Sequence, residues 1–407
     1  MENKKGAFLP QTLTDNVSTP KHHKDSNYFP VGQIVRVADE YHEKGQTPQL
    51  ELRWLPRKRK ELEKDGCDLS KVPKFKGWTN EPDFLNYRED VGGWLNLSQP
   101  LPYLPRYGDW PTIRKLFEHI FGEQLELGFD YYSLILTKPK QLLPILVLAS
   151  EEQGTGKSTL LQFNGFLIGA NAVILNVSQY SQQFNGVYAA KLIIGIDETV
   201  ISEQFIKERL KQDSTATSIQ LRKMHSEHQT LPFYGKFILC TNREKDFAKL
   251  EKEDMRFWVR KVGKIQQFDA DFCTKLKNEV PAFTQFLITR PLSVPTPLSR
   301  MWFSPEQLKT GAFEEIVANS ISECAKDILI WAELHEDNPE FGITETELLI
   351  ELERKYTLTQ VRKALKEELH MENSNKRYND MFGNPKIGRA YIFNEDMPCG
   401  NSSVTSQ

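Results

Sequence analysis

The chain is poor in the features that mark several classes of protein. Its 407 residues include only five cysteines, none in a Cys-x-x-Cys pair, which argues against a disulfide framework and against a zinc site. No apolar run reaches the roughly 18 residues that a membrane span requires. The first residues, Met1–Gly6, also lack the apolar segment of a secretory signal. We therefore expect a cytoplasmic protein with no membrane partner.

The chain also lacks an excess of positive charge. The chain has 52 lysines and arginines against 55 aspartates and glutamates, which gives a formal net charge of −3. No overall positive field exists to steer a polyanion, so a nucleic-acid partner would have to bind local basic patches. The hydrophobic content of 39% and the charged content of 26% are typical of globular domains. The length allows two or three of them.

The most informative segment contains Gly154-Thr155-Gly156-Lys157-Ser158. It follows the apolar run 143–149 and precedes the largely apolar residues 160–163, which predicts a strand, a glycine loop and a helix. In such a loop, backbone N–H groups and the helix N-terminus face a polyphosphate. The lysine would reach the β- and γ-phosphates and the serine hydroxyl would bind Mg²⁺. The full pattern has glycine at position 151, where this chain has Glu151. We expect the ATP phosphates and Mg²⁺ to be bound by Gly154, Thr155, Gly156, Lys157, Ser158 and Thr159.

Two further apolar strands end in polar side chains. Asp197 and Glu198 follow residues 191–196, and Asn242 follows residues 236–241. Open α/β sheets place their ligands at the carboxyl ends of the strands. We therefore assign Asp197 to Mg²⁺, Glu198 to the attacking water as general base, and Asn242 to the γ-phosphate or the water. Taken singly, each is an ordinary strand-end or turn residue. Their order after the glycine loop favours the catalytic interpretation.

Arg256 precedes a fourth apolar strand at residues 257–259. An arginine that reaches the γ-phosphate of a neighbouring subunit would stabilise transition-state charge. A surface ion pair with Asp254 or Glu253 explains Arg256 almost equally well. Arg243 and Arg260 are alternative candidates for the same role.

This series resembles the superfamily 3 helicases, and most closely the primase-helicase family of phages, plasmids and other mobile elements. The resemblance covers about residues 75–265, and its members in chain order are Lys157, Ser158, Asp197, Glu198, Asn242 and Arg256. It implies an AAA+-like P-loop NTPase core with a parallel sheet, using ATP and Mg²⁺. It also implies a ring-shaped homo-oligomer, typically a hexamer, that moves along single-stranded or forked DNA beside a separate primase or polymerase.

The same family carries a basic hairpin that contacts DNA between its second and third strands. Lys223 is the residue that matches the hairpin lysine by position, with His225 beside it. Family members also often carry a small helical collar ahead of the core. In this chain the apolar residues of segment 110–140 recur at helical spacing, as a helix would require: Ile113, Leu116, Phe117, Ile120 and Phe121.

The C-terminal residues are typical of a separate module. We predict a helix over about 314–334 and a strand at 391–393. Between them, the capping box Thr344–Glu347 opens a helix that runs through Lys355, and the capping box Thr357–Gln360 opens a helix over 361–369. Helix, helix and hairpin is the order of a winged helix. Arg362 and Lys366 on the second helix would contact DNA, with further basic residues in the wing at Arg377, Lys386 and Arg389. A winged helix used only for packing is the alternative.

These observations divide the chain into five segments. They are a flexible tail at 1–30, an N-terminal accessory and collar region at 31–140, the ATPase core at 141–300, a winged-helix-like domain at 305–395, and a flexible tail at 396–407. Two other functions stay open beside the helicase. One is a DNA-binding replication initiator or partition-type protein, and the other is an AAA+ helicase loader, with ATP as an assembly switch. Primase activity is not expected of this chain.

Overall fold

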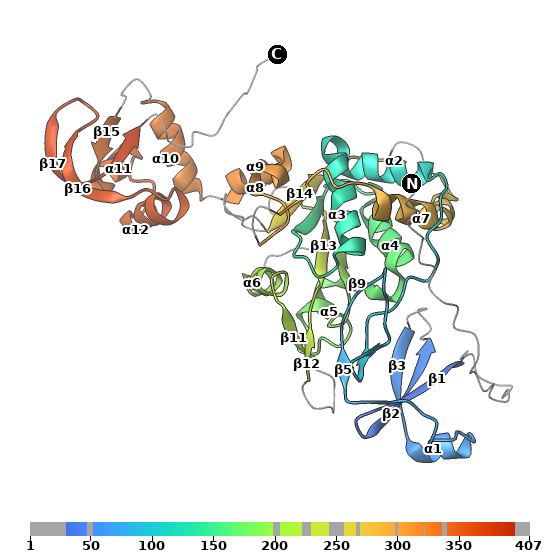
Figure 1. Cartoon of the computed structure of the whole chain (residues 1–407). Coiled ribbons are helices and arrows are strands. Elements are labelled where there is room, and N and C mark those ends of the chain that lie inside the picture. Colours follow the sequence, from blue (N-terminus) through green and yellow to red (C-terminus); the bar gives the residue numbers. More distant parts are fainter. Residues whose placement is uncertain are drawn as a thin grey trace, which may run out of the picture.

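The computed structural model describes residues 30–46, 52–197, 204–221, 229–243, 256–265, 269–297, 300–320, 322–335 and 340–394. Figure 1 shows a small N-terminal β region, a central α/β core and a C-terminal module along these residues. Among them there is no helix with the length and apolar composition that crossing a membrane would demand. Both predicted tails fall outside this part of the chain, apart from Pro30.

Two small sheets form the N-terminal region. Their elements are β1 (Pro30–Val37), β2 (Glu40–Gln46), β3 (Leu52–Arg57), α1 (Arg59–Lys64), β4 (Lys74–Phe75), β5 (Trp78–Thr79), β6 (Asp90–Val91) and β7 (Trp94–Asn96). The first sheet has the order β3-β2-β1-β4 and the second has the order β5-β7-β6. Val35, Val37 and Leu95 form a shared core with Trp54 and Trp78 packed against it, so the two sheets are one unit.

The core is a five-stranded parallel sheet. Its strands are β8 (Ile145–Ala149), β9 (Ala172–Asn176), β10 (Ile193–Asp197), β13 (Lys236–Thr241) and β14 (Phe257–Lys261). They lie in the order β14-β8-β13-β10-β9, and every neighbouring pair is parallel. Strands β8 and β13 are buried along their whole length, because helices cover both faces of the sheet. The strands predicted from the four apolar runs are confirmed, and β9 adds a fifth.

Helices pack on the two faces of this sheet in separate hydrophobic clusters. On one face, Leu146 and Leu148 pack with α2 (Pro111–Phe121), α3 (Leu125–Thr137), α4 (Lys157–Ile168) and α7 (Phe272–Thr289). On the other face, Ile145 and Val147 pack with α5 (Val177–Ser181), α6 (Gln204–Asp213) and α9 (Gly311–Ser320). Short 3-10 turns, η1 (Gly122–Gln124) and η2 (Gly169–Asn171), follow α2 and α4.

Helix α2 buries the apolar residues that its spacing predicted, including Phe117 and Phe121. These two rings stack with those of Phe129 and Trp258, so that α2 shares the hydrophobic cluster of the sheet. The predicted domain boundary at residue 140 and the collar role of this region stay predictions.

A buried ion pair joins the end of α7 to α3. Asp130 is fully buried and pairs with Arg290. Its carboxylate also accepts hydrogen bonds from the Ser293 hydroxyl (2.6 Å) and from the backbone N–H of Val294 (2.8 Å). Because a buried charge needs both a counter-ion and hydrogen-bond donors, these contacts fix the proline-rich exit from α7 against the core.

Strands β11 (Ser218–Leu221) and β12 (Gln229–Pro232) form an antiparallel pair between β10 and β13 in the chain. The predicted DNA-contacting residues Lys223 and His225 belong to the segment that joins them. That segment lies outside the described residues.

The C-terminal module follows the short helix α8 (Pro305–Leu308) and α9. Its elements are α10 (Glu323–Glu333), β15 (Glu340–Ile343), α11 (Glu345–Glu351), α12 (Leu358–Lys363), the π-helical turn η3 (Ala364–Glu368), β16 (Asn373–Asn379) and β17 (Pro385–Asn394). The strands form an antiparallel sheet in the order β15-β17-β16. Phe341, Leu348, Val361 and Phe393 belong to a hydrophobic core of the module itself.

Helix boundaries in this module differ from the prediction in two places. The helix expected over 314–334 is two helices, because the Ser322 hydroxyl accepts a hydrogen bond from the N–H of Ala325 and starts α10 anew. Both predicted capping boxes are present. Helix α11 ends at Glu351 instead of Lys355, because Glu353 and Arg354 have φ angles of +51° and +58°, which no right-handed helix can continue.

Candidate functional site

The glycine loop lies between β8 and α4, as its sequence predicted. Gly154 and Gly156 have φ angles of +70° and +85°, in the left-handed region that favours glycine. A Cβ at Gly156 would also lie 3.1 Å from the Ile265 side chain. Glu151, at the position of the missing glycine, is not among the described residues with positive φ. The loop therefore needs no glycine there.

Helix α4 begins directly after this loop. Its N-cap is Gly156, and no side chain caps the first turn. The N–H groups that start a helix have no partner within it, so this turn offers donors and a positive dipole end to an anion. Lys157 is the first residue of the helix and is buried. Its Nζ donates to the carbonyl oxygens of Ser150 (3.1 Å) and Glu152 (3.3 Å), so the ammonium group points back into the loop.

Ser158 and Asp197 are in direct contact. The Ser158 hydroxyl donates a hydrogen bond of 3.0 Å to Asp197 Oδ2, although the two residues are 39 positions apart in the chain. Asp197 is the last residue of β10, so the contact joins that strand end to the first turn of α4. Hydroxyl and carboxylate oxygens suit Mg²⁺, which takes few protein ligands and completes its shell with water and phosphate. Glu198 lies outside the described residues.

Asn242 immediately follows β13 at the same edge of the sheet. Thr241 pairs with Ala149, and the Thr241 carbonyl accepts a hydrogen bond of 3.1 Å from the N–H of Ser150, the first residue of the loop. The Asn242 side chain is exposed. Burial raises the pKa of the Cys240 thiol, the negative charge of Asp197 raises it further and Lys157 lowers it. Both charges therefore act on the end of β13, close to Asn242.

Two residues that the sequence analysis did not assign hold the loop from outside. His119, in the last turn of α2, lies with Nε2 3.0 Å from the carbonyl oxygen of Thr155. Because a carbonyl only accepts, Nε2 carries the hydrogen. Ile265 donates its N–H to the carbonyl of Gly154 at 3.2 Å. No local pattern in the sequence signals either contact, since each partner is a backbone oxygen.

Arg256 lies where the parallel strands begin, whereas the glycine loop lies where they end. Its carbonyl accepts a hydrogen bond of 2.6 Å from the N–H of Ile145, the first residue of β8. The loop begins after Ala149, the last residue of the same strand. About five strand residues, roughly 16 Å, separate these levels. Arg256 is partly exposed. Arg243, one of its alternatives, directly follows Asn242 and lies at the loop edge instead.

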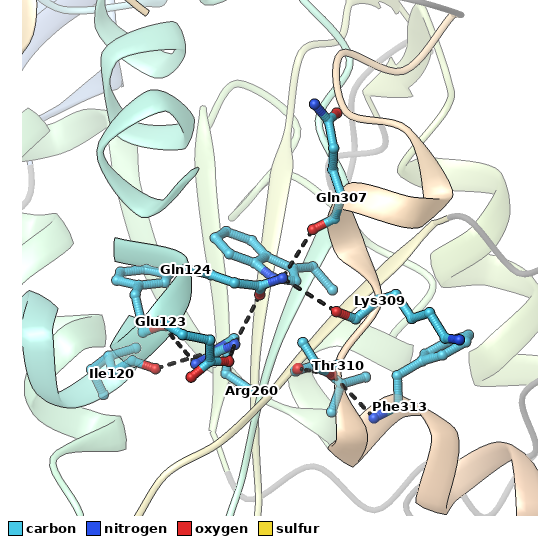
Figure 2. A network of polar contacts seen from close by, with 11 residues as sticks. Ile120, Glu123, Gln124, Arg260, Gln307, Lys309, Thr310 and Phe313 are labelled. Atoms are coloured by element: carbon cyan, nitrogen blue, oxygen red, sulfur yellow. Dashed lines mark hydrogen bonds and ion pairs between the residues drawn. The ribbon is translucent and has the colours of Figure 1, made fainter. Parts of the chain in front are cut away.

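Arg260, the other alternative, is buried and committed elsewhere. Its guanidinium donates to the carbonyl oxygens of Ile120 (3.3 Å) and Phe121 (2.6 Å) at the end of α2. It also pairs with Glu123 at 2.8 Å, which lowers the pKa of that carboxyl group. Figure 2 shows these contacts converging on the guanidinium. Arg260 thus satisfies carbonyls that the helix leaves without partners.

Gln124 extends the same network to the segment that carries α8 and α9 (Figure 2). Its Oε1 accepts from Trp258 Nε1 (2.7 Å) and from Arg260 (2.8 Å). Its Nε2 donates to the carbonyl oxygens of Gln307 (2.9 Å) and Lys309 (3.3 Å). Thr310 adds a hydrogen bond of 2.8 Å to the carbonyl of Val259. Strand β14 is therefore fixed between the end of α2 and the 307–310 segment.

The predicted DNA-contacting residues of the C-terminal module have different surroundings. Arg362 is exposed, and its guanidinium is paired with Glu345 through hydrogen bonds of 2.7 to 3.0 Å. Lys366 is exposed in η3. Among the described residues there is no cluster of three or more histidine, cysteine or acidic side chains placed to hold a metal ion.

A family of unknown function, DUF5906, has a model that matches residues 148–260. That segment begins at the end of β8 and includes the glycine loop, Asp197, Asn242 and Arg256. No curated protein matches the sequence.

Among solved structures, the apo C terminal region of NrS-1 (305–718) matches with a TM-score of 0.64 and 15% identity. The match covers 88% of this chain and 95% of that one. A second apo form of the same region gives a TM-score of 0.63 at 15% identity, over 89% and 96% of the two chains. A JCV helicase bound to a small molecule also matches, but its TM-score of 0.29 supports no argument. At this identity the likeness to NrS-1 concerns the fold, a mixed α/β architecture around a five-stranded parallel sheet.

Proposed function

We propose that the chain is an ATP-dependent DNA helicase of the superfamily 3 type, which couples ATP hydrolysis to movement along single-stranded DNA. The observation that carries this proposal is the hydrogen bond of 3.0 Å between Ser158 and Asp197. P-loop NTPases hold Mg²⁺ with the serine or threonine of the loop and with an aspartate at the end of another strand. The same two residue types meet here beside a loop whose two glycines have positive φ.

In this proposal the triphosphate is bound by residues 154–159. The N–H groups of the loop and of the first turn of α4 would donate to phosphate oxygens, and Lys157 would exchange its carbonyl partners for the β- and γ-phosphates. Ser158 and Asp197 would hold Mg²⁺. Bound there, the ion supplies charge neutralisation for the phosphates.

The remaining roles concern water and the γ-phosphate. Glu198, next to Asp197 in the chain, would take the proton of the attacking water. Asn242 would orient that water or donate to the γ-phosphate from the end of β13. The support for Asn242 is its place one residue beyond Thr241, which is hydrogen bonded to the start of the loop.

Arg256 would complete the site of a neighbouring subunit. It lies at the edge of the sheet away from its own glycine loop, so it cannot serve the triphosphate of its own chain without a large rearrangement. A ring places such an arginine beside the next subunit's loop. This argument supports a homo-oligomeric ring, a hexamer by resemblance.

DNA contacts would come from two places. Lys223 and His225 belong to the segment that joins β11 to β12, where the resembling family has its basic hairpin. The C-terminal module has the order helix, strand, helix, helix, strand, strand with a three-stranded sheet, which supports a winged helix. Arg362 and Lys366 would contact DNA from α12 and η3, provided that Arg362 leaves Glu345.

Two substitutions test the nucleotide roles. Lys157→Ala is expected to lower ATP turnover by about 100-fold or more, because a group that stabilises transition-state charge is lost. Glu198→Gln should bind ATP with nearly the wild-type affinity while turnover falls by about 100-fold or more, because only the general base is removed. The measurements are steady-state ATP hydrolysis and binding of a fluorescent ATP analogue. Lys277→Ala, an exposed lysine on α7, is the matched control and should behave as wild type.

Wild-type turnover in Glu198→Gln would show that the base is another residue. A forked-duplex assay then separates the helicase from the two alternative functions. An initiator would protect DNA from cleavage without unwinding it, and a helicase loader would stay monomeric with ATP and DNA.

A further inference from the structure

The hairpin of β16 and β17 carries cations and apolar side chains on its exposed surface. We propose that this hairpin binds a nucleic-acid strand with unpaired bases, through Arg377 and Arg389 to the phosphates and through Phe382 and Ile387 to the bases. The inference rests on the proposed function for the identity of the partner as DNA. It moves the main contact of the C-terminal module from Arg362 to the hairpin.

The strand register places Arg377, Ile387 and Arg389 on one face of the hairpin. Arg377 pairs with Ile387, and Asn375 pairs with Arg389. Since side chains alternate along a strand, Ile387 and Arg389 share their face of β17 with Tyr391, whose ring is fully buried in the core of the module. The hairpin therefore extends past the helices that cover this face, and its outer half is open to solvent. Figure 1 shows the hairpin on the side of the module away from the ATPase core.

The charge of the hairpin is one-sided. Residues 373–394 contain four basic side chains and one acidic side chain, in a chain of net charge −3. The acid, Asp380, is occupied within the turn, where it accepts hydrogen bonds from the N–H groups of Phe382 and Asn384. A basic surface in an otherwise acidic protein is complementary to a polyanion.

The four cations of the hairpin are not equivalent. Lys386 is paired with Glu347 at 2.7 Å and lies 3.4 Å from Asp380. Arg377 and Arg389 are exposed, and no ion pair joins either of them to another described residue. Arg362, the arginine of the neighbouring helix, is held by Glu345. The arginines of the hairpin can therefore meet phosphates without first breaking an ion pair.

Two large apolar side chains accompany these arginines. Phe382 is 79% exposed in the turn at the tip of the hairpin, and Ile387 is 74% exposed between Arg377 and Arg389. An aromatic ring next to cations suits single strands, because each unpaired base offers a face for stacking while the cations follow the backbone. A duplex hides its base faces and would use the arginines alone.

The test measures DNA binding by the full chain at several salt concentrations. The probes are a fluorescent deoxythymidine 30-mer and a labelled duplex of the same length, followed by fluorescence anisotropy. Arg377→Gln/Arg389→Gln should lower the slope of log K against log salt by about 1.4 for the single strand, since each lost phosphate contact removes about 0.7. Phe382→Ala should weaken single-strand binding by about tenfold and leave duplex binding unchanged.

Arg354→Gln is the matched control, because it removes an exposed arginine from the same module outside the hairpin. It should keep the wild-type slope, and all variants should keep the wild-type melting temperature, since the altered side chains are exposed. Wild-type slope and affinity in the double arginine variant would overturn the proposal. If Phe382→Ala weakened duplex and single-strand binding equally, Phe382 would not be in contact with the bases. If polyglutamate bound the hairpin and did not displace DNA, the partner of the hairpin would be an acidic protein instead of DNA.

The outcomes also separate this inference from the proposed function. A wild-type chain that binds DNA through the hairpin but does not hydrolyse ATP would contradict the helicase and leave the hairpin contact standing. A chain that hydrolyses ATP and binds DNA independently of the hairpin would do the reverse.

Discussion

At the residue scale, the fold buries the amine of Lys236 away from water. It is the first residue of β13 and is only 3% exposed. Its Nζ donates to the carbonyl oxygens of Pro139 and of Tyr234, the latter at 2.6 Å. Burial lowers the pKa of Lys236 from 10.5 to about 7, because the charged form loses its hydration. A neutral amine can still donate to both carbonyls.

This burial predicts a pH dependence of stability. Between pH 7 and 10.5 the unfolded chain keeps the Lys236 proton while the folded chain has released it, so the free energy of unfolding rises with pH in that window. We expect a gain of about 1 to 2 kcal/mol between pH 7 and pH 9, measured by urea unfolding. Lys236→Met should remove this gain. A variant with the same pH profile as the wild type would mean that other groups cause it.

Residues of the candidate site differ in how far the sequence could predict them. The places of Gly154, Gly156, Ser158 and Asp197 between β8 and α4 and at the end of β10 could be predicted, because each follows a continuous apolar run. Their roles toward phosphate and Mg²⁺ stay predictions. Arg260 was an alternative for the arginine that reaches a neighbouring subunit's γ-phosphate, and the fold shows its guanidinium bonded to the end of α2. His119 received no role, since its partner is a backbone oxygen 36 residues away and any sequence supplies one.

At the element scale, the buried strands and the two helix starts with capping boxes could be predicted, whereas two other helix boundaries could not. A parallel strand is a continuous apolar run, which stands out in the sequence. The break between α9 and α10 depends on one serine hydroxyl, and the end of α11 depends on two residues with positive φ. Neither alters the apolar pattern from which the helices were predicted.

The network around Gln124 gives a prediction for β14 and the elements beside it. Gln124→Leu would leave the fully buried Trp258 without an acceptor for its indole N–H and free two backbone carbonyls. We expect a loss of about 2 to 3 kcal/mol in the free energy of unfolding, measured by urea titration. Glu123→Gln is the control and should cost less than about 0.5 kcal/mol, because that side chain is 76% exposed. Equal losses would assign the stabilisation to Arg260 and Glu123.

At the scale of the whole molecule, β14 separates the two halves of the proposed ATP site. Lys261 pairs with Ala149 next to the glycine loop, and Arg256 stands at the other end of the same strand. Under the proposal, a single chain therefore contains one half-site at each end of its parallel strands. Under the proposal, turnover needs two chains.

Mixing inactive variants tests this directly. Arg256→Ala and Lys157→Ala should each lack turnover alone, yet a mixed ring forms some interfaces with an intact loop on one side and an intact arginine on the other. We expect up to about a quarter of wild-type ATP hydrolysis at equal proportions, from random pairing at a site of this kind. Lys157→Ala alone is the control and should show no recovery of ATP hydrolysis. No recovery at any ratio would count against action of Arg256 on the site of a neighbouring subunit.

The hydrogen bond from His119 to Thr155 limits how much of the chain can be removed from the N-terminal side. A truncation that starts at the first strand of the sheet would discard the imidazole under the loop, the helix end that Arg260 caps and the aromatic rings stacked on Trp258. Under the proposed function, the smallest fragment that binds a nucleotide is therefore expected to begin upstream of α2.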